Sequence, residues 1–180
     1  LWVWVQQGSQ VGLWVRAAGQ TDFTRVIAPP QALPRRAVLA AADPQPPGSP
    51  DQIYVFSDDG GNGAPRLFRV ACATAAAPTF TLVNAVPDVL GKQGFYDIAL
   101  SVHPARKDHV VLGGSTFPAL TPSGNALLTT AGTKDGAIVA ADVAVNGTGV
   151  LSFGQPAAPK MIGAGVHADV HDLVYAKAGH

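Results

Sequence analysis

Short apolar runs, separated by clusters of Gly, Pro, Asn, Asp and Ser, recur along the whole chain. In the stretch 94–114, an apolar run over residues 98–102 ends at His103-Pro104, and a β-branched run over residues 110–112 follows a polar turn. Apolar runs of about four to six residues between turn-forming residues are typical of β-strands, and a short turn between two of them predicts a hairpin. The pattern therefore predicts an antiparallel β-fold organised around this hairpin.

The first strand of this hairpin is rich in small residues. Ala99 and Ser101 alternate with Ile98, Leu100 and Val102, so the two sets point to opposite faces. Both faces of such a strand can be buried where space is tight. This is what the innermost strand of a propeller blade requires, because the blades crowd together near the axis.

The other apolar runs fall into similar units along the chain. An antiparallel meander of three strands comes first, then a unit of four strands, then a second unit of four, and finally one strand. The predicted strands cover residues 1–5, 12–16 and 23–27; 38–42, 53–56, 66–71 and 79–83; 98–102, 110–112, either 125–129 or 137–145, and 150–153; and 171–175. Residues 116–135 are expected to be an inserted loop or an extra hairpin.

These units predict an all-β fold, a segment of a β-propeller with about three four-stranded antiparallel blades. The stops at Asp43-Pro44 and His103-Pro104 give a long repeat, as expected of four-stranded blades with insertions. The expected boundaries are 1–35 for the end of a blade, 36–93 and 94–165 for two blades, and 166–180 for the first strand of a further blade. A β-sandwich of about a dozen strands is the alternative that the same pattern allows.

The composition narrows the function classes. Charged residues make up 13% of the chain and the net charge is zero, so neither nucleic acid nor an acidic membrane surface is an expected partner. The single cysteine, Cys72, excludes an internal disulfide and a cysteine-built metal site. No apolar run is long enough to span a membrane. The opening residues LWVWV lack the basic flank of a secretory signal, and they look like the middle of a domain.

Two motifs point to a family. Residues 57–61 have the spacing Ser-x-Asp-x-Gly, which resembles the Asp box, and residues 22–26 resemble the end of the same repeat with Phe23 in place of Trp. The chain thus resembles the BNR/sialidase-like repeat propellers, which include sortilin-type receptors and xyloglucan-cleaving glycosidases. We interpret Ser57 and Asp59 as capping groups of a tight turn. A Ca²⁺ site at Asp58 and Asp59 lacks the number of oxygen ligands that such a site needs.

The spacing His167-x-Asp169-x-His171 is the sharpest constellation of polar residues. On a strand, the three side chains would share one face, about 7 Å apart. Two imidazoles and a carboxylate are metal ligands in kind, and they are also expected as hydrogen-bonding or ligand-binding groups. The segment resembles the H-x-D-x-H-x-L segment that BNR propellers carry at the mouth of the central channel. This resemblance favours a channel-mouth role for His167 and His171, with no metal and no cofactor.

Tyr96 and Asp97 occupy the equivalent place one blade earlier. The stretch GFYDIAL resembles the setting of a catalytic aspartate in xyloglucan-cleaving propellers, which implies Asp97 and Asp169 as an acid–base pair. Asp97 is one residue further from the following Leu than in that setting, so its carboxylate would face the other side of the strand. A sialidase mechanism needs a Glu beside its Tyr nucleophile, and this chain has no Glu.

Two functions follow as expectations. The first is a secreted or periplasmic scaffold, hence an extracellular or periplasmic protein, that binds a protein or a glycan through Tyr96, His167 and His171. The second is a glycoside hydrolase that uses Asp97 and Asp169. Closed propellers usually have at least four blades, so we expect another polypeptide or further blades to complete the ring.

Overall fold

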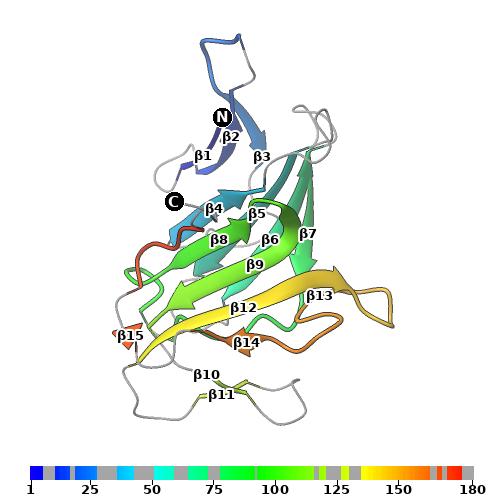
Figure 1. Cartoon of the computed structure of the whole chain (residues 1–180). Coiled ribbons are helices and arrows are strands. Elements are labelled where there is room, and N and C mark those ends of the chain that lie inside the picture. Colours follow the sequence, from blue (N-terminus) through cyan, green and yellow to red (C-terminus); the bar gives the residue numbers. More distant parts are fainter. Residues whose placement is uncertain are drawn as a thin grey trace.

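The structure is an assembly of β-strands. The computed structural model describes residues 1–5, 11–16, 19–27, 36–42, 51–58, 65–72, 78–91, 93–115, 118–120, 127–129, 135–162, 166–167 and 170–175. Within these ranges all regular secondary structure is β-strand, and there is no helix. The all-β prediction is confirmed. Figure 1 shows the strands gathered into antiparallel sheets that lie on one another.

Three antiparallel sheets follow one another along the chain. The first sheet contains β1 (Trp2–Val5), β2 (Gly12–Val15) and β3 (Thr24–Ile27). The second contains β4 (Arg36–Ala41), β5 (Asp51–Asp58), β6 (Arg66–Cys72) and β7 (Thr79–Val83). The third has the order β8 (Ala99–His103), β9 (Arg106–Gly114), β12 (Asp135–Val145) and β13 (Leu151–Phe153). Each is a meander, and none of them closes on itself within the described ranges.

The third sheet settles the alternative left open for its third strand. β12 pairs with β9 from Ala137–Gly114 to Asp142–His109. The other candidate lies in a separate hairpin of β10 (Pro118–Leu120) and β11 (Leu127–Thr129), so the extra hairpin expected within residues 116–135 is confirmed. After β13, the short strands β14 (Lys160–Met161) and β15 (Val166–His167) also pair with β12.

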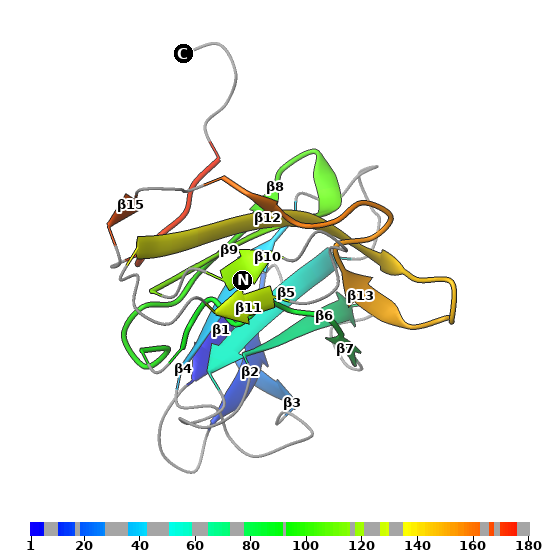
Figure 2. The ribbon, with the colours of Figure 1, turned by 90° about the horizontal axis from the view of Figure 1, so that it is seen from below.

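The central strands of the second sheet are buried on both faces. Tyr54 and Phe56 of β5 belong to a large apolar cluster with side chains of the third sheet, such as Leu112. Ile53 and Val55 belong to a second cluster, which contains residues of the first sheet. Successive side chains of a strand point to opposite faces, so a continuous apolar run suits a strand that is covered on both sides. Figure 2 shows β12 in one layer and β5 and β6 in the neighbouring layer.

The outer face of the third sheet is covered by residues 170–175. A Cβ atom at Gly113 would lie 2.6 Å from Cγ1 of Val170 and 3.3 Å from Cβ of Ala99. Glycine at this position therefore lets the segment pack directly on β8 and β9. Ala99 is 1% exposed, which agrees with the prediction that the first hairpin strand is buried on both faces.

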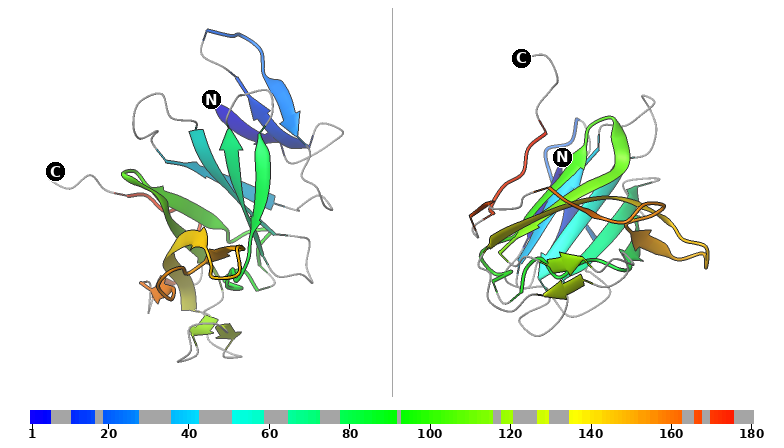
Figure 3. Two further views of the ribbon diagram at one scale, coloured as in Figure 1. Left: turned by 90° about the vertical axis from the view of Figure 1, so that its right-hand side faces the viewer. Right: turned by 60° about the horizontal axis from the view of Figure 1, so that its bottom comes forward.

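The strand predicted over residues 171–175 is not formed. These residues have no regular secondary structure, and Figure 3 shows them as a red ribbon without an arrow. A strand requires a hydrogen-bonded neighbour along its edge. Val170 and Leu173 instead lie on the face of β8 and β9, while Val174 is 83% exposed. The prediction of a strand here is wrong because its apolar residues pack on the sheet without pairing along an edge.

Three hydrogen-bonded polar side chains connect the second sheet to the third at one end. Gln52 Nε2 donates to the Tyr54 hydroxyl at 3.1 Å and to Asp108 Oδ1 at 2.9 Å. The Tyr54 hydroxyl in turn donates to Asp108 Oδ1 at 3.4 Å. Burial raises the pKa of Tyr54 well above its ordinary value, and the negative charge of Asp108 adds to this effect.

This pKa shift predicts a loss of stability at alkaline pH. The folded protein favours the neutral phenol of Tyr54, so the contribution of this residue to the free energy of unfolding is complete below about pH 10. This contribution is lost as the pH rises further, because the tyrosine then ionises in the unfolded chain. Chemical denaturation at about pH 8 and pH 11 should show a smaller alkaline loss for Tyr54→Phe than for the wild type. Equal losses for the two proteins would contradict the burial of this hydroxyl.

Candidate functional site

Three chain segments begin side by side at one end of the sheets. The Arg36 guanidinium, at the start of β4, donates to the carbonyl oxygens of Phe95 (3.4 Å) and Tyr96, just before β8. The Tyr96 ring meets the His171 ring edge to face, with 4.6 Å between centroids. His171 Nε2 lies 3.7 Å from Asp97 Oδ1. We call Arg36, Phe95, Tyr96, Asp97 and His171 the strand-start cluster.

A tight turn positions Tyr96 and Asp97. Their backbone N–H groups both donate to the carbonyl oxygen of Gln93 at 2.8 Å. Gly94 within this turn lies so close to Asp58 that a Cβ atom would be 2.8 Å from the Asp58 Cβ. Only glycine allows this approach, which brings the end of β5 against the turn and so fixes where β8 begins.

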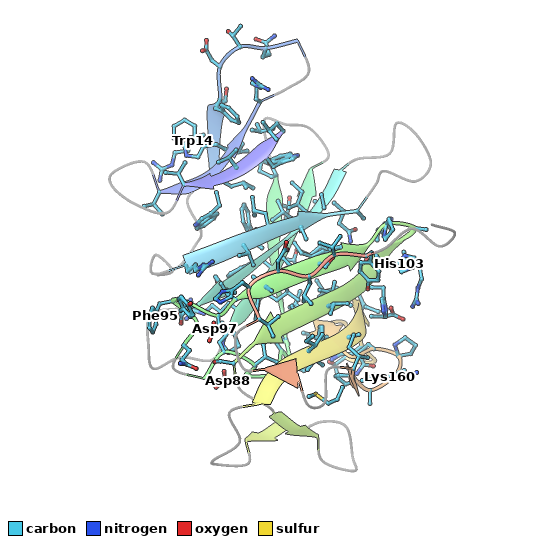
Figure 4. The ribbon with its side chains drawn as sticks, turned by 60° about the vertical axis from the view of Figure 1, so that its left-hand side comes forward. Trp14, Asp88, Phe95, Asp97, His103 and Lys160 are labelled. Carbon is cyan, nitrogen blue, oxygen red and sulfur yellow. The ribbon has the colours of Figure 1, made fainter. Side chains whose placement is uncertain are left out.

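The cluster has a buried part and an exposed rim. The Asp97 side chain is 0% exposed, whereas Tyr96 is 51% and Phe95 57% exposed. A buried carboxylate needs compensating donors or charges, and the His171 imidazole is one group close enough to act in this way. The arrangement offers two exposed aromatic rings above a layer of charged and hydrogen-bonding groups. Figure 4 shows Phe95 and Asp97 near each other at one end of the hairpin.

The structure brings together three of the five residues predicted for the site. Tyr96, Asp97 and His171 are in contact, as described above. The backbone of His167 lies in β15, opposite Asp135, but its side chain is outside the described part of the structure. Asp169 also lies outside the described residues. The separation of the Asp97 and Asp169 carboxylates, which decides between glycosidase mechanisms, is therefore not defined.

Arg36 is the residue that sequence reasoning missed. It was identified only as the start of a unit, although it is the first residue of β4, and Asp97 lies close to the start of β8. Comparing the starts of successive inner strands would have found it. Polar side chains at such starts are expected to meet wherever the strands themselves run side by side.

The Asp-box motif places only one of its side chains, Ser57, in the described part of the structure. Ser57 is buried at the end of β5 and its hydroxyl donates to the Arg66 carbonyl oxygen at 3.4 Å, while Asp59 and Gly61 lie outside the described residues. Within the part of the chain that the structure describes, no group of three His, Cys, Asp or Glu side chains could hold a metal ion. In the same part, no helix is long and apolar enough to cross a membrane.

Comparison with known proteins adds no family. No family model matches the chain, and no curated protein or solved structure matches it. The likeness to BNR repeats stays a prediction from the sequence motifs. The strand-start cluster and the stacking of the sheets are consequently the features from which a function can be inferred.

Proposed function

We propose that this chain is a segment of a BNR-like β-propeller that acts as a glycan-binding scaffold, with the strand-start cluster as its binding surface. The observation that carries the proposal is the meeting of Arg36, at the start of β4, and Tyr96, just before β8, with His171 of the segment that packs on β8 and β9. In a propeller, the inner strands of neighbouring blades surround one axis. Their starts therefore come together at one mouth, where a ligand can contact several blades.

The chemistry of the cluster suits a glycan. Phe95 and Tyr96 are each more than half exposed, and exposed aromatic rings offer an apolar face on which a sugar ring can stack. Arg36 and His171 supply hydrogen-bonding groups for hydroxyl groups, while Asp97 lies buried beneath them. A protein ligand is the other class that such a surface suits, and it is an outcome of the test below.

The proposal includes further blades from the same or another polypeptide. The outer face of the first sheet carries an apolar hollow of about 270 Å³, lined by Val3, Val5, Trp14 and Phe23. Val3 and Phe23 are each 37% exposed. A neighbouring blade would cover this face in the way that the second sheet covers the other one. An extracellular or periplasmic location is part of the same proposal, as the resemblance to BNR-type propellers implies.

The glycosidase alternative depends on Asp97. A general acid in a buried position is a known arrangement in glycosidases, and Asp97 is fully buried. Direct contact with a substrate, however, requires exposure that this carboxylate lacks. Binding is therefore the better-supported function, and hydrolysis is tested beside it.

A glycan array combined with a hydrolysis screen tests the proposal. The folded chain should bind a restricted set of glycans, and Tyr96→Ala should lose them. Binding to none of the glycans would contradict the glycan assignment, and a pull-down that depends on Tyr96 would then favour a protein ligand. If the chain hydrolyses a bound oligosaccharide and Asp97→Asn abolishes this activity, the chain is a glycoside hydrolase and not a binding scaffold.

A further inference from the structure

A second polar group lies at the opposite end of the β8–β9 hairpin. Arg106 Nη2 lies 2.7 and 2.9 Å from the two carboxylate oxygens of Asp142. His109 Nδ1 lies 2.6 Å from Asp142 Oδ1, so the imidazole donates its proton to this carboxylate. Both oxygens of Asp142 thus have donors already. Figure 4 labels His103 at this end of the hairpin, away from Asp97.

This group forms one wall of a hollow of about 390 Å³. Val111 of β9, Ala140 of β12 and Ile162 supply apolar surface to the hollow. Its volume falls within the range of small-molecule sites, about 300–1,000 Å³, and such sites combine an apolar lining with a few polar groups. The hollow is therefore large enough for a small organic molecule with an apolar body.

Tyr175 and Lys160 add two further polar groups to the lining. The Tyr175 ring packs edge to face on His103, with 5.0 Å between centroids. Its hydroxyl oxygen is buried and has no hydrogen-bond partner among the described residues. A buried hydroxyl without a partner reduces stability. Lys160 is exposed and forms no ion pair within the described part of the chain.

The lining consequently includes one buried donor without an acceptor, the Tyr175 hydroxyl, and one solvent-exposed cation, the Lys160 ammonium. Tyr175 can donate one hydrogen bond and Lys160 three, while the one carboxylate in the lining is occupied by Arg106 and His109. A ligand that brings an anionic acceptor would satisfy these groups, and an apolar body would fill the space beside Val111 and Ile162.

We propose that the hollow between β9, β12 and Tyr175 binds a small organic carboxylate with an apolar body. The site is separate from the strand-start cluster, and it does not depend on the glycan proposal. Only residues 170–175 contribute to both, since His171 belongs to the cluster and Tyr175 to the hollow.

Titration of the whole chain with benzoate, followed by ligand-observed NMR, tests this proposal. Benzyl alcohol is the matched neutral probe, with the same ring and no charge. Benzoate should bind saturably and roughly tenfold or more tightly than benzyl alcohol, because hydrogen bonds to a charged group are the stronger ones. Equal binding of the two probes would overturn the proposal.

Two variants locate the bound anion. Lys160→Gln should weaken benzoate binding roughly tenfold, whereas Arg16→Gln, which removes the same charge from the first sheet, should leave it unchanged. Tyr175→Phe should weaken binding while the melting temperature of the free protein stays equal or rises, because the unpartnered hydroxyl is removed. A purely structural tyrosine would lower stability without a matching loss of affinity. Benzoate binding that is unaffected by both Lys160→Gln and Tyr175→Phe would contradict the site.

Discussion

Replacing Phe56 with alanine is expected to lower the free energy of unfolding by about 3–5 kcal/mol. Phe56 is 0% exposed and lies in the cluster that joins the second sheet to the third. Truncating a buried aromatic side chain removes its burial and leaves a cavity that its neighbours fill only in part. Because small domains are stable by only about 5–15 kcal/mol, this loss is a large share of the total. Urea denaturation measures it directly.

Phe23→Ala is the matched control for this variant. Phe23 is 37% exposed on the outer face of the first sheet, so its truncation should cost no more than about 1 kcal/mol. Similar losses for the two variants would mean that the second and third sheets do not pack face to face through Phe56.

Ala99→Phe is expected to lower the melting temperature by roughly 5 °C or more. Ala99 is a buried residue of β8, on the face that the segment 170–175 covers. A phenyl ring at this position would clash with Val170 and Leu173, so the segment would have to leave the sheet. The same displacement would move His171 away from Tyr96 and Asp97 and would weaken ligand binding at the strand-start cluster.

Val145→Phe serves as the control for added bulk, since Val145 is 60% exposed in the same sheet. Thermal unfolding of the two variants should differ clearly. An Ala99→Phe protein that melts together with the Val145→Phe protein would place Ala99 at the surface and contradict the packing of residues 170–175.

The sheets could be predicted from local sequence because their strands are short, apolar and bounded by turn-forming residues. The run over residues 53–56 is apolar at every position, and its strand is covered on both faces. The hairpin over residues 98–112 was likewise clear from its pattern. What local sequence could not supply is the partner of each edge, which explains why residues 171–175 were read as a strand.

The candidate site was predictable in part. Tyr96, Asp97 and His171 were chosen by comparing the starts of two units, and they do lie together. Arg36 was missed because an arginine beside a strand has many ordinary explanations. The group of Arg106, His109 and Asp142 was missed for a different reason. Asp142 is more than thirty residues from both Arg106 and His109 in sequence, and only the register of β9 against β12 brings it to them.

Residues 170–175 link the two ends of the third sheet. His171 contacts Tyr96 at one end, and Tyr175 contacts His103 at the other. The segment is held by side-chain packing on Gly113 rather than by a ladder of hydrogen bonds. The geometry of both sites therefore depends on one short segment and on the small residues beneath it.

The affinity of the strand-start cluster for its ligand is the most direct test of the central claim. Calorimetric titration with the glycan selected on the array should compare the wild type with Tyr96→Ala, Tyr96→Phe and Leu82→Ala, where Leu82 is an exposed residue of β7. We predict that Tyr96→Ala weakens binding at least about tenfold, because it removes a stacking ring, while Tyr96→Phe and Leu82→Ala bind nearly as well as the wild type. Equal affinities for Tyr96→Ala and Leu82→Ala would contradict a binding site at the strand starts.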